Sequence, residues 1–252
     1  MILLKRYYLA TVGDYTKKTI LHGMFTTGCS GVYLFPSSET KEKAYEIVDE
    51  ITNNFGLAGS EIKVIEVDSL DYWGTVGRII DCILGIYKKE EECEVIVDAS
   101  GGTRIMTLAA ITAAILARVD GIYYFFYDYR NERIIKLNLP KISIRLPSET
   151  KLMILKVLRE VKKEGIKIKQ YAQLAQQIEK KLSVSEVEKI GRSKGKLSEK
   201  INELARFGFI KKVPLEEDKR RFLIEITKDG ECIIRIAEKV EEINKYRKNM
   251  AQ

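Results

Sequence analysis

Histidine is the scarcest reactive residue of this chain, because its 252 residues include only one, His22. The four cysteines, at positions 29, 82, 93 and 232, are scattered and form no C-x-x-C pair. A zinc site needs clustered thiolate and imidazole ligands, so we expect no metal site. Dispersed cysteines are typical of a reducing compartment, and we expect inert thiols in a cytoplasmic protein.

Long apolar segments and the common nucleotide-binding motifs are also missing. No uninterrupted apolar run approaches the roughly 18 residues of a membrane helix, and no signal-peptide cleavage pattern follows the N-terminus. We therefore expect no membrane association. The sequence contains no G-x-x-x-x-G-K-[ST], and no G-x-G-x-x-G follows its first predicted strand. An ordinary NTPase or dehydrogenase is therefore disfavoured.

The most informative stretch is residues 94–106, EVIVDASGGTRIM. Val95–Val97 is a short β-branched run typical of a buried strand, and the Ala- and Leu-rich segment from Thr103 favours a helix. The turn between them, Ser100-Gly101-Gly102, lets a phosphate or ribose approach the main chain near the free amides of the helix start. The guanidinium group of Arg104 adds a positive charge and several hydrogen-bond donors that suit phosphate. The alternative is that the two glycines only make a tight turn.

Strands and helices alternate through the first half, which predicts an α/β domain with a Rossmann-like, mostly parallel sheet. The predicted strands are residues 7–12, 31–35, 62–67, 95–97 and 121–127, with a hairpin partner at 133–137 that residues 141–146 could extend. The predicted helices are residues 16–25, 39–55, 71–87 and 103–118. The first and fourth strands both end in loops suited to a ligand, as expected on the two sides of a topological switch point.

Charge is distributed unevenly along the chain. Residues 1–147 carry 17 Lys and Arg against 19 Asp and Glu, a net charge of −2, whereas residues 148–252 carry 26 against 17, a net charge of +9. A basic half joined to a nearly neutral half suggests a polyanion partner for one domain. The alternative is a well-solvated Lys/Glu surface, which explains the number of lysines but not their segregation.

The basic half resembles winged helix-turn-helix domains. Two helices are predicted at residues 149–164 and 171–182, followed by a polar segment at 183–192 and a Lys/Ser-rich helix at 193–207. Two strands at 210–214 and 221–226 and a final helix at 231–248 complete the order. In such domains the third helix enters the major groove of DNA and the wing reaches phosphates. The resemblance implies the DNA-binding residues Arg192, Ser193, Lys194, Lys196, Ser198, Lys200, Lys219, Arg220 and Arg221. The alternative is a winged helix used only for protein contacts or dimerisation.

With D-x-S-G-G-x-R after its fourth strand, the whole chain resembles CARF (CRISPR-associated Rossmann fold) proteins, in particular the archaeal CARF–winged-helix transcriptional regulators of CRISPR loci. The resemblance implies a CARF domain at residues 1–146 and a winged helix at 147–252. It also implies a homodimer whose pocket spans the two-fold axis and binds cyclic oligoadenylate, commonly cyclic tetra-adenylate, without a further cofactor. The ligand-binding residues that it implies are Thr11, Gly13, Asp14, Tyr15, Ser37, Ser100, Gly101, Gly102, Thr103, Arg104 and Met106.

Enzyme activity is a further question for this family, because other CARF proteins carry ribonuclease domains with R-x(4–6)-H. The nearest arginine before His22 is Arg6, so that motif is absent and no catalytic residue is predicted. Two alternatives to a DNA-binding regulator stay open. One is a slow, metal-independent ring nuclease that uses Ser100, Thr11, Lys17 or Arg104 on its own ligand. The other is an adaptor that recruits other CRISPR proteins through the basic domain.

Overall fold

The computed structural model describes residues 4–55, 57, 61–128, 130–140, 144, 146–191, 194–215 and 222–250. The predicted strand extension at 141–146 falls largely outside these ranges. The chain divides into two compact units, one formed by residues 1–144 with 238–252 and the other by residues 145–237. Each unit is described by itself.

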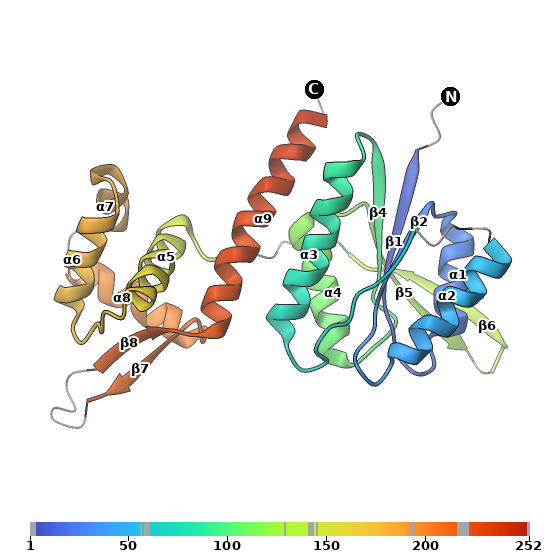
Figure 1. Ribbon diagram of the computed structural model, residues 1–252, viewed down its shortest axis with the longest axis horizontal. Helices are drawn as coiled ribbons and strands as arrows, with labels where there is room; N and C mark the ends of the chain where they lie inside the picture. The colour runs from blue at the N-terminus through green and yellow to red at the C-terminus, as the bar shows by residue number, and fades with distance from the viewer. Residues whose placement is uncertain are drawn as a thin grey trace. The chain divides into compact units, whose positions relative to one another are not determined.

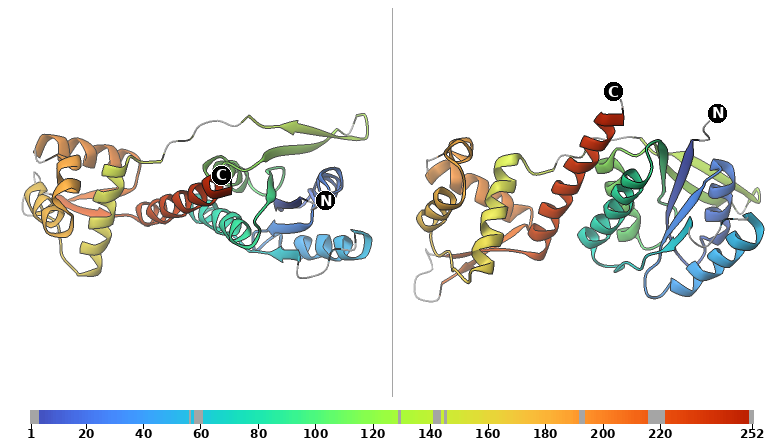
Figure 2. Two further views of the ribbon diagram at one scale, coloured as in Figure 1. Left: turned by 90° about the horizontal axis from the view of Figure 1, so that it is seen from above. Right: turned by 45° about the horizontal axis from the view of Figure 1, so that its top comes forward.

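The first unit is built on a six-stranded sheet with the order β3-β2-β1-β4-β5-β6. Strands β1 to β5 run parallel, and β6 is antiparallel to β5. Helices α1 and α2 cover one face of the sheet, and α3 and α4 pack together on the other (Figures 1 and 2). The strands are β1 (Lys5–Thr11), β2 (Gly31–Phe35), β3 (Ile62–Val64), β4 (Cys93–Asp98), β5 (Gly121–Asp128) and β6 (Arg133–Asn138). The helices are α1 (Lys17–Thr27), α2 (Lys41–Phe55), α3 (Tyr72–Lys89) and α4 (Arg104–Ala117).

The core of this unit follows from the alternation of side chains along its central strands. In β1, Tyr8 and Ala10 face α1 and α2 and pack in a buried cluster with Ile20 and Met24. Strand β4 lies between β1 and β5, and its residues Val95–Val97 are buried. Helices on both faces of a parallel sheet leave such a central strand without a polar face, which explains the continuous β-branched run.

The observed order of elements confirms the predicted α/β architecture with a mostly parallel sheet. Strands β1 and β4 are parallel neighbours, as the predicted switch point requires. The predicted third strand, 62–67, was too long, because β3 ends at Val64. Val67 N–H still donates to Pro36 O at 2.9 Å. Pro36 has no N–H to donate in return, so a regular strand pair cannot continue past it.

In its described residues, the second unit contains four helices followed by the β7-β8 hairpin and the start of α9. The elements are α5 (Glu149–Lys163), α6 (Tyr171–Lys181), α7 (Val184–Ile190), α8 (Lys194–Arg206), β7 (Ile210–Pro214), β8 (Phe222–Ile226) and α9 (Lys228–Met250). The buried apolar residues come from several of these elements and include Ile154, Leu158, Leu174, Ile201, Leu204 and Ile224. Among the residues described in either unit, no helix combines the length and apolar character that crossing a membrane requires.

Helix α7 is a feature that the sequence interpretation missed, since residues 183–192 were treated only as a polar segment. Ser183 and Glu186 form a capping box at its start, with Ser183 N–H donating to the Glu186 carboxylate at 2.9 Å. Val187 and Ile190 are buried on its inner side. The S-x-x-E spacing is a known signal of a helix start and was present in the sequence.

Helix α9 starts at Lys228, earlier than the predicted residue 231. Its residues from 238 onward group with the first unit. There Glu242 pairs with Lys88 of α3 at 2.7 Å, and Arg247 donates to Tyr87 Oη at 2.8 Å. The predicted boundary at 146/147 assigns all of this helix to the second domain and so differs from the observed grouping. The sequence of a Lys/Glu-rich helix does not show which neighbour it pairs with.

Candidate functional site

Two loops meet at the carboxyl edge of the parallel sheet, one after β1 and one after β4. Thr11 Oγ1, at the end of β1, donates a hydrogen bond to Gly101 O at 2.7 Å. A Cβ added to Gly101 would lie 2.0 Å from Thr11 O, and one added to Gly13 would lie 2.7 Å from Gly102 N. Side chains cannot be accommodated at such distances, so glycine is required for the two loops to touch.

The loop after β4 leads directly into α4. Gly102 has a φ of +77°, a left-handed conformation that favours glycine. Thr103 caps the helix, because its Oγ1 accepts from Met106 N–H at 3.3 Å and donates to Ser69 O at 3.1 Å. Met106 is completely buried, and its side chain would be the first group met by a Cβ on Gly102. Met106 therefore packs against the Gly102 turn from inside the protein.

A buried hydrogen-bond network holds this turn in place. The carboxylate of Asp98 is fully buried and accepts from Tyr8 Oη at 2.6 Å and from Ser100 N–H at 2.8 Å. Ser100 Oγ also donates to Asp98, and it accepts from Phe125 N–H at 2.7 Å. Burial raises the pKa of Asp98 to about 6, although the hydrogen bonds from Ser100 and Tyr8 act to lower it. The single hydroxyl proton of Ser100 is thus donated to Asp98 within the protein.

Arg104 is a charged residue of the motif that faces solvent, as the neighbouring Thr103 also does. It is the first residue of α4, and within the described part of the chain it has no hydrogen-bond or ion-pair partner. The first turn of α4 contains no acidic residue. A helix start carries free amides and partial positive charge, so Arg104 adds a full charge where an anion is already favoured. This combination suits a phosphate group.

The loop after β1 presents two exposed side chains, Asp14 and Tyr15, and Tyr15 is 90% exposed. Thr16 closes the loop, because Gly13 N–H donates to Thr16 Oγ1 at 2.9 Å. An exposed aromatic ring beside a phosphate site is suited to stacking on a nucleobase. The structure therefore brings Thr11, Gly13 and residues 100–104 to one edge of the sheet, with Asp14 and Tyr15 in the adjoining loop.

Ser37 lies in a third loop, after β2, and is buried. Its N–H donates to Thr40 Oγ1 at 3.0 Å, and Thr40 Oγ1 in turn donates to Val12 O at 3.1 Å. Ser37 and Thr40 therefore tie the β2–α2 turn to the end of β1. Thr40 and Tyr8 were not predicted as parts of this site. The S-x-x-T spacing could have indicated Thr40, whereas Tyr8 has the pattern of an ordinary core residue.

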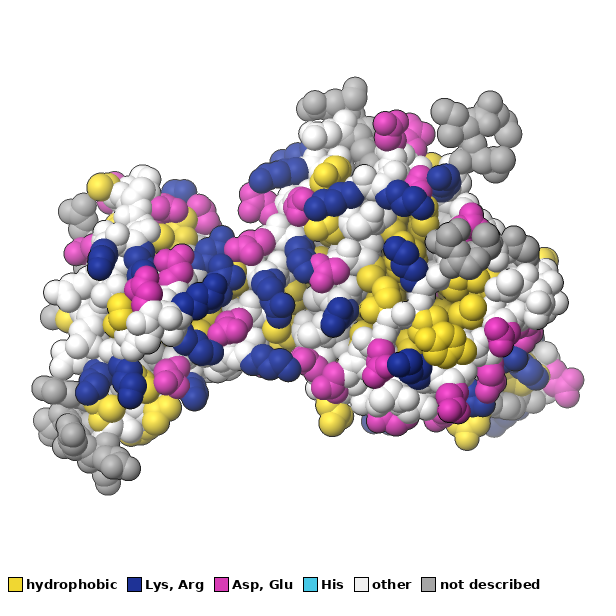
Figure 3. Space-filling view, in the orientation of Figure 1, with side chains coloured by type: hydrophobic (Ala, Val, Ile, Leu, Met, Phe, Trp, Pro, Cys, Tyr) yellow, Lys and Arg dark blue, Asp and Glu magenta, His cyan; other side chains and the backbone are white. Residues whose placement is uncertain are grey.

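In the second unit, a shallow hollow runs along the outer face of α8. It is lined by Gly195, Ser198, Glu199, Asn202, Glu203 and Arg206. Of the predicted DNA-binding residues on this helix, Lys196 is exposed, and Ser198 and Lys200 are partly exposed. Lys and Arg side chains are interspersed with acidic ones over the visible face of both units (Figure 3). Predicted residues outside the described part of the chain are Arg192, Ser193, Lys219, Arg220, Arg221 and the side chain of Lys194.

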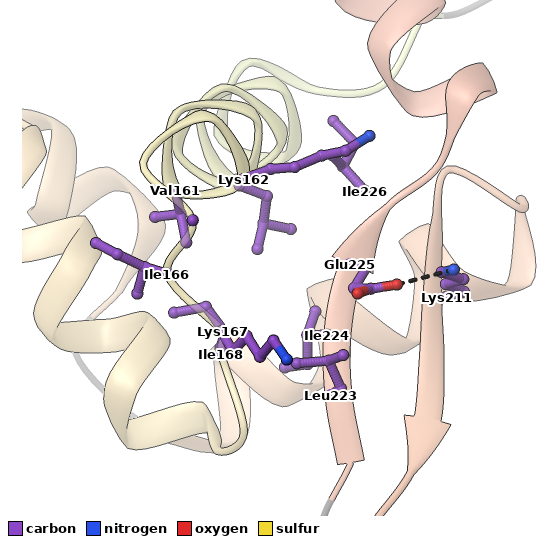
Figure 4. Close-up of a pocket in the computed structure, with 12 residues that line it drawn as sticks. Val161, Lys162, Ile166, Lys167, Ile168, Lys211, Leu223, Ile224, Glu225 and Ile226 are labelled. Carbon is purple, nitrogen blue, oxygen red and sulfur yellow. Dashed lines mark ion pairs between the residues drawn. The ribbon is translucent and has the colours of Figure 1, made fainter.

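Another hollow of the second unit, of about 270 Å³, lies between α5 and β8 (Figure 4). Its walls are largely apolar and include Val161, Ile166 and Ile224, while Lys211 at its edge pairs with Glu225 at 2.8 Å. None of the predicted site residues lines it. Among the described residues of the whole chain, no group of three or more Asp, Glu, Cys or His side chains is placed to hold a metal ion.

A family model described as the Csa3 CRISPR-associated Rossmann-like domain matches residues 6–132, just over half of the chain. The chain belongs to this family. The matched range contains both loops of the carboxyl-edge site, so that site is part of the Csa3 Rossmann-like domain, as the CARF resemblance predicted. A search of curated proteins found no match.

Solved structures similar to this member of the Csa3 family are distant in sequence. Can2 from Sulfobacillus thermosulfidooxidans, solved in complex with cyclic tetra-adenylate, is 17% identical over 94% of this chain and 65% of its own, with a TM-score of 0.39. Csm6 of Enterococcus italicus, bound to cyclic hexa-2′-fluoro-hexa-dAMP, is 13% identical over 82% of this chain and 57% of its own, with a TM-score of 0.42. The chain thus spans less than two thirds of either protein's length.

Proposed function

We propose that this protein is a homodimeric transcriptional regulator of a CRISPR system. In this proposal the Csa3 Rossmann-like domain senses a cyclic oligoadenylate, with cyclic tetra-adenylate as the first candidate, and the second unit binds double-stranded DNA. The observation that carries the proposal is the exposed Arg104, which has no partner among the described residues and lies beside the Gly101–Gly102 turn at the start of α4. A ring of nucleotides presents several phosphates with rotational symmetry, so it suits two copies of such a site related by a two-fold axis.

An apolar stripe on α4 supports the homodimer. Leu108 is 57% exposed, and Ile111 and Ile115 are partly exposed. Their spacing of three and four residues places them on one side of the helix, in line with Arg104. A second copy packed on this stripe would bring two Arg104 side chains to a shared site.

The β5-β6 hairpin carries a second apolar face that also lacks a cover among the described residues. Phe126 is 37% exposed and Leu137 is 45% exposed. Their cross-strand neighbours are Ile135 and Tyr124, which lie on the same face because paired residues of antiparallel strands point the same way. Phe125, one residue away, packs in the cluster on the α1 side, so this face is on the α4 side of the sheet. Exposed apolar surface of this kind marks an interface, and it adjoins the stripe on α4 in the proposed dimer.

The DNA part of the proposal is supported by charge and by the order of elements in the second unit. The sequence from residue 148 carries a net charge of +9. Helix α8, with Lys196 and Lys200 toward solvent, would enter the major groove, and the β7-β8 hairpin would serve as the wing. Lysine contacts to phosphate give affinity that falls with salt and carry no sequence information by themselves.

The ring-nuclease alternative has less support from the side chains. Thr11 Oγ1 donates to Gly101 O, Ser100 Oγ donates to Asp98, and Lys17 pairs with Glu50 at 2.6 Å. Of the four groups considered for that reaction, Arg104 is the one left without a partner among the described residues. A regulator needs only that the ligand bind two states of the dimer unequally.

Calorimetric titration of cyclic tetra-adenylate into the full-length protein tests the ligand part. We expect one ring per two chains, and we expect Arg104→Ala to weaken binding by about tenfold or more, because a charge-assisted contact contributes about 1.5–3 kcal/mol. The control is Arg118→Gly, which removes the same charge at the other end of α4. Arg118 is exposed with a φ of +54°, a conformation that glycine adopts readily. No binding by the wild type, or equal losses in both variants, would contradict the proposal.

A further inference from the structure

The loop between β3 and α3 is bonded to α4 on both sides of Leu70. Thr103 Oγ1, at the cap of α4, donates to Ser69 O at 3.1 Å. Tyr72 Oη shares a hydrogen bond with Thr112 Oγ1, farther along α4, at 2.7 Å. Because Leu70 lies between Ser69 and Tyr72, its backbone is held beside the start of α4.

The same loop is also held by its own hydrogen bonds. Asp68 Oδ1 accepts from Leu70 N–H at 2.9 Å. Asp68 O accepts from Asp71 N–H at 3.2 Å and from Thr75 Oγ1 at 3.1 Å, and Asp71 caps α3 by accepting from Gly74 N–H at 2.9 Å. Leu70 is nevertheless 77% exposed. The backbone thus fixes a large aliphatic side chain in solvent at the carboxyl edge of the sheet.

Leu70 and Tyr15 lie in two different loops that touch the same phosphate-type turn. The loop after β1, which carries Tyr15, contacts this turn at Gly101, and the loop that carries Leu70 contacts it at Thr103. A single exposed leucine needs no explanation by itself. One that is fixed beside a site suited to phosphate can pack on a base, because a nucleotide carries a flat ring close to its phosphate. Each copy of the chain therefore offers two side chains that suit a base.

We infer that Leu70 contacts a base of the bound ring, and that Tyr15 and Leu70 of two copies together hold four bases. The inference rests on the proposed homodimer and on its binding of a cyclic oligoadenylate. A two-fold axis turns two base positions into four, which is the number of bases in cyclic tetra-adenylate. Cyclic hexa-adenylate would leave two bases without such a contact. Leu70 is thus a specificity-determining residue that favours the smaller ring.

Calorimetric titration of the full-length protein with cyclic tetra-adenylate and with cyclic hexa-adenylate tests the inference. We expect the wild type to bind the tetra-adenylate ring more tightly. Leu70→Ser should weaken that binding by about tenfold, because the substitution removes an apolar contact in both copies. Leu70→Met should keep most of the affinity, since methionine retains a flexible apolar side chain.

The matched control is Leu4→Ser, which makes the same change just before β1, at the opposite edge of the sheet from the site. Leu4 is also exposed, at 47%, and this variant should bind both rings as the wild type does. Leu70→Ser should keep the melting temperature and the dimer of the wild type, because an exposed side chain contributes little to stability. A monomer in sedimentation analysis would assign Leu70 to the dimer interface and overturn the inference.

The remaining outcomes separate the inference from the proposed function. If Leu70→Ser binds cyclic tetra-adenylate as tightly as the wild type, or if Leu4→Ser loses as much affinity, the inference is wrong while ligand sensing stands. The same holds if the wild type binds cyclic hexa-adenylate at least as tightly as cyclic tetra-adenylate. If the wild type binds neither ring, both the inference and the proposed ligand are wrong.

Discussion

Gly101→Ala tests most directly how the carboxyl-edge site is built. The added Cβ would lie 2.0 Å from Thr11 O, 2.8 Å from Thr11 C and 3.2 Å from Gly13 N. Since all three atoms belong to the backbone, relief requires the two loops to move apart by about 1 Å, which breaks the bond from Thr11 Oγ1 to Gly101 O. Overpacking of this kind costs about 1–3 kcal/mol and the lost hydrogen bond about 1 kcal/mol. The melting temperature should therefore fall by about 5–15 °C, at 2–4 °C per kcal/mol.

The matched control for that substitution is Gly85→Ala in α3. A Cβ on Gly85 would meet nothing within 4 Å, and the residue is exposed in the middle of a helix. Alanine is a better helix former, so this variant should be more stable by about 0.5–1 kcal/mol. Calorimetric melting of both variants, with a cyclic tetra-adenylate titration of each, is the assay. If Gly101→Ala melts within about 2 °C of the wild type, roughly the shift per kcal/mol, and binds the ligand equally well, the two loops do not need glycine at this contact.

Three further predictions concern titration, assembly and folding. Burial raises the pKa of Asp98 from its ordinary 3.8 to about 6 in the fold, so its contribution to stability is fully present below pH 4 and is lost as pH rises through 6. Urea unfolding from pH 4 to 7 should show the wild type losing about 3 kcal/mol relative to Asp98→Asn, and parallel pH curves would contradict the burial of this charge. Leu108→Asp should give a monomer in sedimentation analysis, whereas an unchanged dimer would place the interface elsewhere. Ser183→Ala should lower the unfolding free energy of the second unit by about 1 kcal/mol in denaturant titration, and no change would mean that the capping box contributes nothing.

Local patterns predicted the elements of the first unit well, and they marked the two loops that the structure brings together as a candidate site. The β-branched run at Val95–Val97, followed by a Gly-Gly turn, indicated a buried strand and a ligand loop. The structure adds that β1 and β4 are neighbours, so the two predicted loops lie at one edge. Sequence spacing cannot give the close approach of Gly101 to Thr11, because these residues are far apart in the chain. For the same reason it could not show that Tyr8 supports Ser100 through Asp98.

The second half was predicted less completely. Periodicity indicated α5, α6 and the hairpin, but a short helix with a polar surface such as α7 gives a weak periodic signal, and only its capping box marks it. The pairing of α9 with α3 depends on ion pairs such as Lys88–Glu242, and many lysines and glutamates could have paired instead. The hydrogen bond from Lys212 of β7 to Asn202 of α8 likewise depends on tertiary structure, because the two residues belong to different elements.

The central claim is that ligand binding in the Csa3 Rossmann-like domain changes DNA binding by the second unit. The decisive measurement is the affinity of the full-length protein for a selected duplex, at fixed salt, with and without saturating cyclic tetra-adenylate. The account predicts a change of about fivefold or more in the wild type, the lower end of typical coupling between sites, and a much smaller change in Arg104→Ala. Equal affinities with and without the ligand in the wild type would contradict it.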